Sequence, residues 1–79
     1  MDNRFHYLTF TVYEYQTFQF TIEWLIDKEI EFRLKTKVNE VGTWIYKFKI
    51  NVRRIDKAKR QKLMWLITNE EAYDIRYVE

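Results

Sequence analysis

Several residue types that support particular chemistries are absent from this chain or nearly so. The sequence has no cysteine, no proline and no serine, and it has one glycine and one histidine. The absence of cysteine and serine excludes disulfides, thiolate metal sites and both Cys and Ser nucleophiles. A glycine-rich phosphate-binding loop is excluded too, because such a loop needs several glycines. We therefore predict a protein that is not an enzyme and that uses no metal and no cofactor.

What the chain does contain is typical of one small folded domain. Its 79 residues leave no room for a second core, so residues 1–79 are expected to form a single domain. Hydrophobic residues make up 47% and charged residues 33%, a balance typical of globular rather than disordered chains. No apolar run approaches the roughly 20 residues that span a bilayer, and the first residues lack the pattern of a secretory signal. We expect a soluble, cytoplasmic protein without a membrane partner.

Alternation of apolar and polar residues predicts three strands directly. The first follows residues 8–12, and two more follow residues 30–38 and 44–52. The loop Asn39–Gly42 joins the last two into a hairpin and places the only glycine where a positive φ is expected.

Residues 15–29 fit two descriptions. Polar and apolar side chains alternate strictly over residues 17–24, which predicts a strand, whereas Phe18, Ile22 and Leu25 fall at the spacing of one helix face. We favour the strand, because eight alternating positions rich in Thr and Phe suit a pleated surface. The helix is kept as the alternative.

The two-residue alternation ends after Arg54, and the spacing of apolar residues beyond it predicts one helix. Asp56 suits the N-cap position, residues 57–70 carry apolar side chains at helical spacing, and residues 72–78 indicate a short last strand. The sequence thus predicts an α+β fold, a four-stranded antiparallel β-meander followed by one α-helix and a short C-terminal strand. If residues 15–29 are helical, the alternative is a βαββαβ ferredoxin-like plait.

The predicted meander also carries a prediction about assembly. Its inward positions place sixteen large apolar side chains on one sheet face. Four strands make a sheet roughly 15–20 Å wide, and a helix of about fourteen residues, about 10 Å across, covers around half of that face. Because soluble monomers seldom expose so large an apolar remainder, we predict a homodimer.

Positive charge is concentrated in the middle of the chain. Residues 33–62 contain eleven Lys and Arg and two acids, whereas residues 1–32 and 63–79 are net acidic. The cations share the outward face of the hairpin and continue into the first turns of the predicted helix, where the helix dipole disfavours them. A placement that opposes local stability indicates an external anion, for which nucleic-acid phosphate is the commonest source. The candidate contacts are Arg33, Lys35, Lys37, Lys47, Lys49, Arg53, Arg54, Lys57 and Arg60.

Aromatic side chains accompany this basic face. Phe5, Tyr7 and Tyr13 occupy outward positions of the first strand, and stacking on aromatic rings next to cations is how single strands are held. A lysine-rich sheet face also serves as an ordinary solvated surface that protects a sheet edge. The two interpretations are both kept.

Other polar candidates indicate structure rather than chemistry. His6 has no partner ligands of the kind a metal site needs, so it reads as a strand residue. The acidic pair Glu29 and Glu31 and the acids of residues 70–74 read as turns and helix ends rather than acid–base or Mg²⁺ sites. The tryptophans read as core or interface anchors, namely Trp24, Trp44 and Trp65.

Two functions from different classes follow. The first is a small non-enzymatic nucleic-acid-binding module that favours single strands and has little sequence selectivity. The second is a protein-binding inhibitor or adaptor of the kind that phages, viruses and other mobile elements encode. The abundance of Phe, Tyr, Ile, Asn and Lys is typical of AT-rich coding sequences, which are common among such elements.

Overall fold

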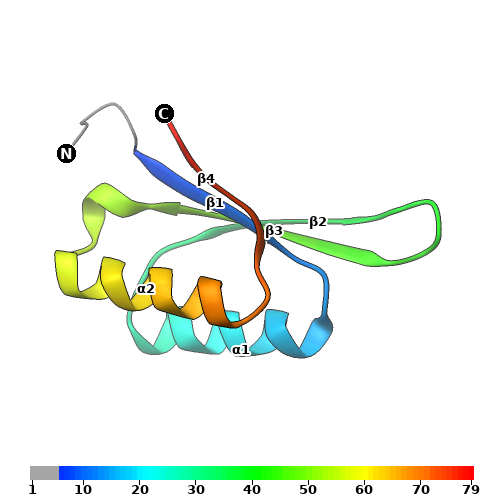
Figure 1. Cartoon of the computed structure of the whole chain (residues 1–79), viewed down its shortest axis with the longest axis horizontal. Coiled ribbons are helices and arrows are strands. Elements are labelled where there is room, and N and C mark those ends of the chain that lie inside the picture. The colour runs from blue at the N-terminus through cyan, green and yellow to red at the C-terminus, as the bar shows by residue number, and fades with distance from the viewer. Residues whose placement is uncertain (1–5) are drawn as a thin grey trace.

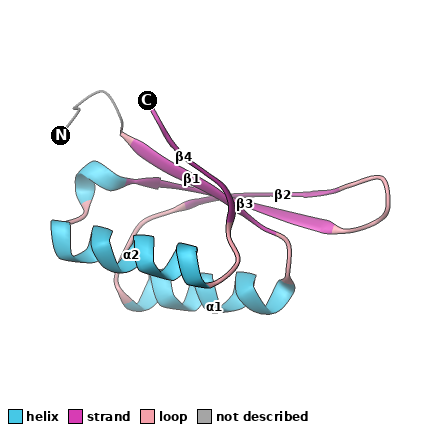
Figure 2. Ribbon diagram, viewed as in Figure 1, coloured by secondary structure: helices cyan, strands magenta, loops and turns pink. Residues whose placement is uncertain are grey.

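The computed structural model describes residues 6–79, which form a sheet with two helices packed on one of its faces (Figure 1). The sheet has four strands in the order β2-β3-β1-β4, and all neighbouring strands are antiparallel (Figure 2). In chain order the elements are β1 (Tyr7–Val12), α1 (Tyr15–Asp27), β2 (Arg33–Val38), β3 (Trp44–Asn51), the 3₁₀ turn η1 (Val52–Arg54), α2 (Lys57–Asn69) and β4 (Tyr73–Val78).

The α+β class with a four-stranded antiparallel sheet is confirmed, and the arrangement is the βαββαβ alternative. The strand favoured over residues 17–24 is corrected, because Tyr15–Asp27 is a helix. Such a strand has no place beside β1, because β1 pairs with β3 on one side and with β4 on the other. The C-terminal strand therefore occupies the place beside β1 that the meander gave to its second strand.

The residues of α1 that face the core explain why this segment forms a helix rather than a strand. Thr21 and Leu25 are buried, and Phe18 and Ile22 pack against the core from the same side. The Thr21 hydroxyl donates to the Thr17 carbonyl at 2.7 Å, so it is satisfied within the helix. Burial thus follows the helical spacing.

Neither end of α1 carries the usual sequence signal. Glu14 is the N-cap residue, but its side chain makes no capping hydrogen bond. At the other end, Glu29 takes a positive φ of 57°, and the Ile30 N–H donates to the Leu25 carbonyl at 2.9 Å. This is a Schellman-type ending with glutamate where glycine is usual, so composition does not reveal it.

The hairpin and the second helix lie close to their predicted positions. The predicted loop is present, with Gly42 at φ 84° and its N–H donating to the Asn39 carbonyl. Asp56 caps α2 by accepting a 2.8 Å hydrogen bond from the Lys59 backbone N–H. In Figure 1 the tip of the hairpin extends beyond both helices.

The core lies between the sheet and the two helices. Phe48 of β3 is at its centre: its ring stacks on Phe10 at 5.0 Å between centroids and is tilted against Phe18 and Phe32 at 6.2 and 5.8 Å. Leu63, Leu66 and Ile67 bury the inner side of α2 against the same core.

The homodimer was predicted because a single helix would leave part of the apolar sheet face uncovered. Two helices cover this face, so that reason no longer applies. Leu8, Phe10, Phe48 and Ile50 on the apolar face of the sheet are almost completely buried within one chain. That face therefore needs no second copy to cover it. The opposite face of the sheet carries no helix, and it is the surface on which the predicted site lies (Figure 2).

Candidate nucleic-acid interface

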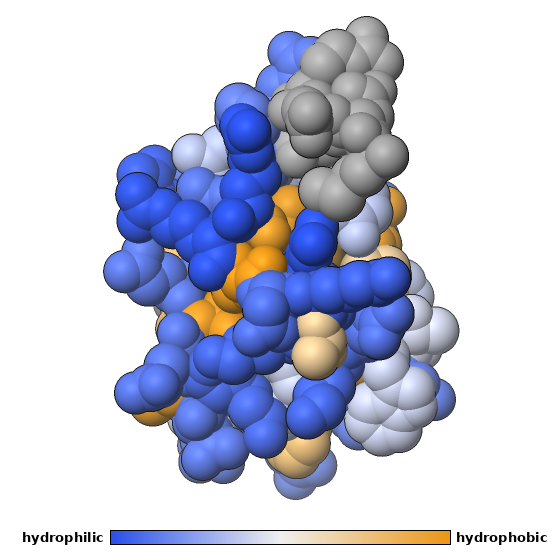
Figure 3. All heavy atoms as spheres, turned by 90° about the vertical axis from the view of Figure 1, so that its left-hand side faces the viewer, coloured by the Kyte–Doolittle hydropathy of each residue, from blue (hydrophilic) through white to orange (hydrophobic). Residues whose placement is uncertain are grey.

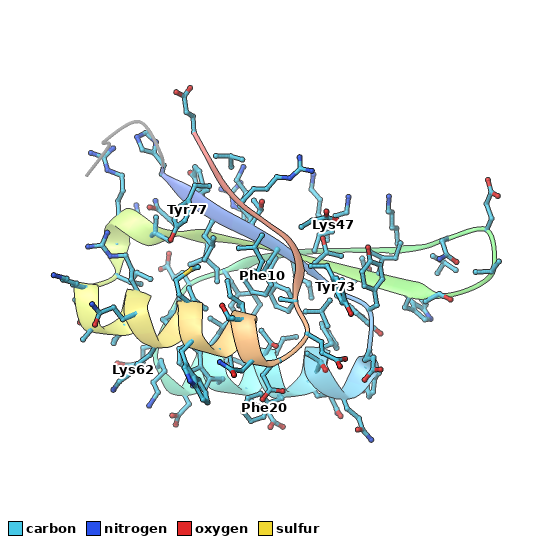
Figure 4. The ribbon with its side chains drawn as sticks, viewed as in Figure 1. Phe10, Phe20, Lys47, Lys62, Tyr73 and Tyr77 are labelled. Carbon is cyan, nitrogen blue, oxygen red and sulfur yellow. The ribbon has the colours of Figure 1, made fainter. Side chains whose placement is uncertain are left out.

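The helix-free face of the sheet, called here the open face, is built by the outward positions of the strands. Residues that alternate with the buried ones project from it, because successive side chains of a strand point to opposite sides. Figure 4 shows Lys47 on the side of the sheet away from the helices. Five of the predicted contacts lie on this face, namely Arg33, Lys35, Lys37, Lys47 and Lys49.

Like charges face each other across two neighbouring strands. Arg33 of β2 is directly opposite Lys49 of β3, and Lys35 is directly opposite Lys47. Like charges at directly opposed positions destabilise a sheet. Within residues 6–79, the recorded ion pairs join Lys28 to Asp27 and Arg54 to Glu31, so none of these four cations forms an ion pair with an acid of the described residues.

Tyr7 lies beside these cations at the start of β1. The Lys49 ammonium sits 4.4 Å from the centroid of the Tyr7 ring, a cation–π contact. Both side chains line a hollow of about 500 Å³ together with Phe32, Arg33 and other residues of the α1–β2 connection and of β3. An aromatic ring and cations therefore meet in one concave part of the open face.

A second hollow of about 340 Å³ continues across the middle of the open face. Lys35, Lys47 and Arg76 line it from three different strands, and Thr9 and Asp74 also contribute. Lys49 and Arg33 belong to both hollows. The two hollows thus form one basic path across the sheet.

The other predicted aromatic, Tyr13, lies at the far end of β1. Its ring makes an edge-to-face contact with Tyr73 at 5.3 Å between centroids, and both rings are exposed. Tyr73 is the register partner of Thr11, an outward position of β1. The prediction for Phe5 falls outside the described residues 6–79.

Arg53 and Arg54 are at the end of the molecule where η1 leads into α2. Figure 3 looks at this end and shows mostly hydrophilic side chains around a narrow apolar strip. Arg54 Nη1 is 3.3 Å from Glu31 Oε2, and both residues line the hollow beside Tyr7. Arg53 Nη1 lies 2.6 Å from His6 Nε2, which must accept because a guanidinium only donates.

His6 comes directly before β1, and its backbone continues the pairing of that strand. Its N–H donates to the Val78 carbonyl, and its carbonyl accepts from the Val52 N–H. Among residues 6–79, no three His, Asp or Glu side chains gather closely enough to hold a metal ion.

Lys57 and Arg60 lie on a different surface from the other predicted contacts. They line a shallow hollow between α2 and β4 with Gln61, Met64 and Tyr77, on the helix side of the sheet. The Tyr77 hydroxyl contacts Met64 Sδ there at 3.4 Å. The structure thus separates these two cations from the open face, because α2 packs on the opposite side.

Two residues of the open face were missed from the sequence. Arg76 is paired with Thr9 of β1, and Tyr73 is paired with Thr11. A shift of register between these pairs interrupts the two-residue alternation of β4, and Asp74 there has a φ of 51°. The outward positions of this strand therefore could not be read from alternation alone.

The fold and the site define a class: a small α+β domain with one helix-covered sheet face and one open, basic face. Comparison of the chain with family models, curated proteins and solved structures found no match. Within residues 6–79, neither helix has the length and apolar character that crossing a membrane requires.

Proposed function

We propose that this protein is a non-enzymatic module that binds single-stranded nucleic acid on its open face. The observation that supports it most strongly is that Arg33 is opposite Lys49 and Lys35 is opposite Lys47 across two strands, with no ion pair to an acid among the described residues. Like charges at directly opposed positions lower the stability of the sheet. A phosphate backbone lying along this face supplies the missing negative charge.

The aromatic side chains support a single strand as the ligand. A base that stacks on Tyr7 takes the place of the Lys49 ammonium now 4.4 Å from the ring centre, and the lysine is then close to a phosphate. Tyr13 and Tyr73 offer two further rings at the far end of β1. Every base has a flat face that can stack, so this mode of binding has little sequence preference.

The proposal is tested by titrating wild-type protein against labelled oligonucleotides at several salt concentrations. Each phosphate contact releases a counterion, so the logarithm of the binding constant should fall linearly with the logarithm of salt, by about 0.7 per contact for a single strand. We expect a steep slope, similar constants for unrelated sequences and weaker binding to a duplex. No oligonucleotide binding near 50 mM salt, a condition at which phosphate contacts are strong, would contradict the proposal.

Replacement of Tyr7 separates stacking from charge. We expect Tyr7→Ala to weaken single-strand binding by about 1–3 kcal/mol while the salt slope stays the same, because stacking releases no ions. The matched control is Tyr15→Ala, since Tyr15 is an exposed tyrosine of α1 on the helix side. Equal losses in both variants, measured by fluorescence anisotropy, would argue against a role for Tyr7.

A protein-binding inhibitor or adaptor is the second candidate, and the hairpin tip favours it. Val38 and Trp44 are register partners there, and both are about half exposed, while Val41 in the loop is more exposed still. Exposed apolar side chains on a projecting hairpin suit a protein partner. If the oligonucleotide titration shows no binding, this candidate takes the place of the first.

A further inference from the structure

The outer surface of the helix layer carries large exposed rings. In α1, burial of Thr21 and Leu25 toward the sheet leaves Phe20 on the opposite side of the helix, and 46% of Phe20 is exposed. In α2, Trp65 is 65% exposed for the same reason, because the neighbouring Leu66 and Ile67 face the core. Figure 4 shows Phe20 and Lys62 below the helices, on the side away from Lys47.

The two helices that form this surface carry opposite charges. Over its whole length α1 contains two acids, Glu23 and Asp27, and no Lys or Arg. The helix α2 contains four cations and no acid; they are Lys57, Lys59, Arg60 and Lys62. The layer is therefore acidic along one helix and basic along the other.

Not all of these charges point outward. The Lys59 ammonium donates to the Lys28 carbonyl at 2.9 Å, which places it between the helices. Lys62 is exposed and lies one turn beyond Lys59 on the side of α2 that faces α1. Asp27 is 3.7 Å from the Lys28 ammonium, yet its side chain is 76% exposed, and Glu23 is exposed as well.

The two helices run in opposite directions, as Figure 1 shows. A two-fold axis lying in the contact plane and parallel to the helices places α1 of one copy over α2 of the other, twice in the same dimer. An in-plane axis perpendicular to the helices instead places acid over acid and base over base. Electrostatic complementarity therefore selects the first arrangement.

We propose that a second copy of this chain docks on the outer surface of the helix layer, around an axis parallel to α1 and α2. Trp65 and Phe20 supply the apolar centre of the contact, as aromatic side chains do in many interfaces. Lys62 of each copy faces Glu23 and Asp27 of its partner copy. The contact is self-complementary, so it closes with two copies.

This dimer has a consequence for binding, which rests on the proposed function. The helix layers meet at its centre, so the two open faces point outward in opposite directions. Each dimer then has two separate basic faces and can hold two strands at once. The dimer itself does not depend on nucleic-acid binding, and the two are tested by different measurements.

The dimer is tested by sedimentation equilibrium at micromolar concentrations, with variants in which charges of the contact are reversed. Wild-type protein should show about twice the 10.0 kDa mass of one chain. We expect Lys62→Glu to raise the dimer dissociation constant at least about tenfold, because it places an acid over the acids of α1. The double variant Glu23→Lys/Asp27→Lys should have the same effect.

Mixing these two variants should restore the dimer as a heterodimer, because each acidic surface then meets a basic one. A single chain with all three substitutions should also dimerise, because reversal of both charges keeps the two surfaces complementary. The perpendicular axis would instead predict no weakening in Lys62→Glu alone or in Glu23→Lys/Asp27→Lys alone, since like charges face each other there as in the wild type. Lys37→Glu on the open face is the matched control and should leave the wild-type mass unchanged. A monomeric wild type, or a dimer that none of the exchanges weakens, would overturn the proposal. Circular dichroism shows which variants are folded, and restored mass in the mixture requires that both are.

Discussion

Replacing the four hairpin lysines by glutamine should lower the affinity for single strands by several hundredfold near 0.1 M salt. The variant changes Lys35, Lys37, Lys47 and Lys49, which project from the open face on β2 and β3. Each lost phosphate contact removes about 0.7 from the salt slope, so four contacts remove about 2.8, and the loss of affinity shrinks as salt rises. Fluorescence anisotropy over a range of salt concentrations measures the slope and the affinity together.

The same variant should fold at least as well as the wild type. Surface substitutions usually change stability by no more than about 0.5 kcal/mol, and removal of the Lys35–Lys47 opposition relieves a repulsion between register partners. The control changes Lys57 of α2 to glutamine, because this lysine is exposed on the helix side and lies outside the proposed dimer contact. An equal loss of affinity per lysine in the control would show that the charge of the whole chain, rather than the open face, determines binding.

Truncation of Phe48 is expected to have the largest effect on stability. Its ring contacts Phe10, Phe18 and Phe32, so it joins β1, α1 and the α1–β2 connection in one cluster. Removal of a buried phenylalanine side chain costs about 3–5 kcal/mol. Total stabilities are typically about 0.05–0.15 kcal/mol per residue, so Phe48→Ala should leave much of this small domain unfolded. Urea denaturation followed by circular dichroism measures the change.

Phe20→Ala is the matched control for Phe48→Ala, and it also tests the helix. Phe20 is 46% exposed on the outer side of α1, so its truncation should cost much less than that of Phe48. In the strand first favoured for residues 17–24, Phe20 would instead face the core with Phe18. A loss in Phe20→Ala as large as that in Phe48→Ala, at concentrations where the protein is monomeric, would contradict the helix.

The hairpin and α2 were predictable because their signals are local. Alternation over residues 30–38 and 44–52, with one glycine between them, is enough to specify two paired strands. The Asp56 carboxylate accepts from the Lys59 N–H only three residues away. The same alternation places four lysines on one face of the hairpin, namely Lys35, Lys37, Lys47 and Lys49. Most of the candidate site was therefore also predictable from the sequence.

The segment that became α1 was not predictable, because its sequence satisfies two periods at once. Phe20 and Trp24 fit the strand pattern, yet Phe20 is exposed and Trp24 is only partly buried. Thr21 and Leu25, which the strand pattern would have turned outward, are buried. No capping side chain and no glycine mark the ends of this helix, since Glu14 precedes it and Glu29 takes the positive φ after it.

By itself, the sequence determined the hairpin, the second helix and the clustering of positive charge, because each depends on residues close together in the chain. The tertiary structure decided the rest through contacts between distant residues. Once β4 pairs with β1, bringing Arg76 beside Thr9, both sides of β1 are occupied, so residues 15–27 do not pair with β1 and bury their apolar side as the helix α1. That same pairing adds Arg76 and Tyr73 to the open face, and the packing of α2 on the other side removes Lys57 and Arg60 from it.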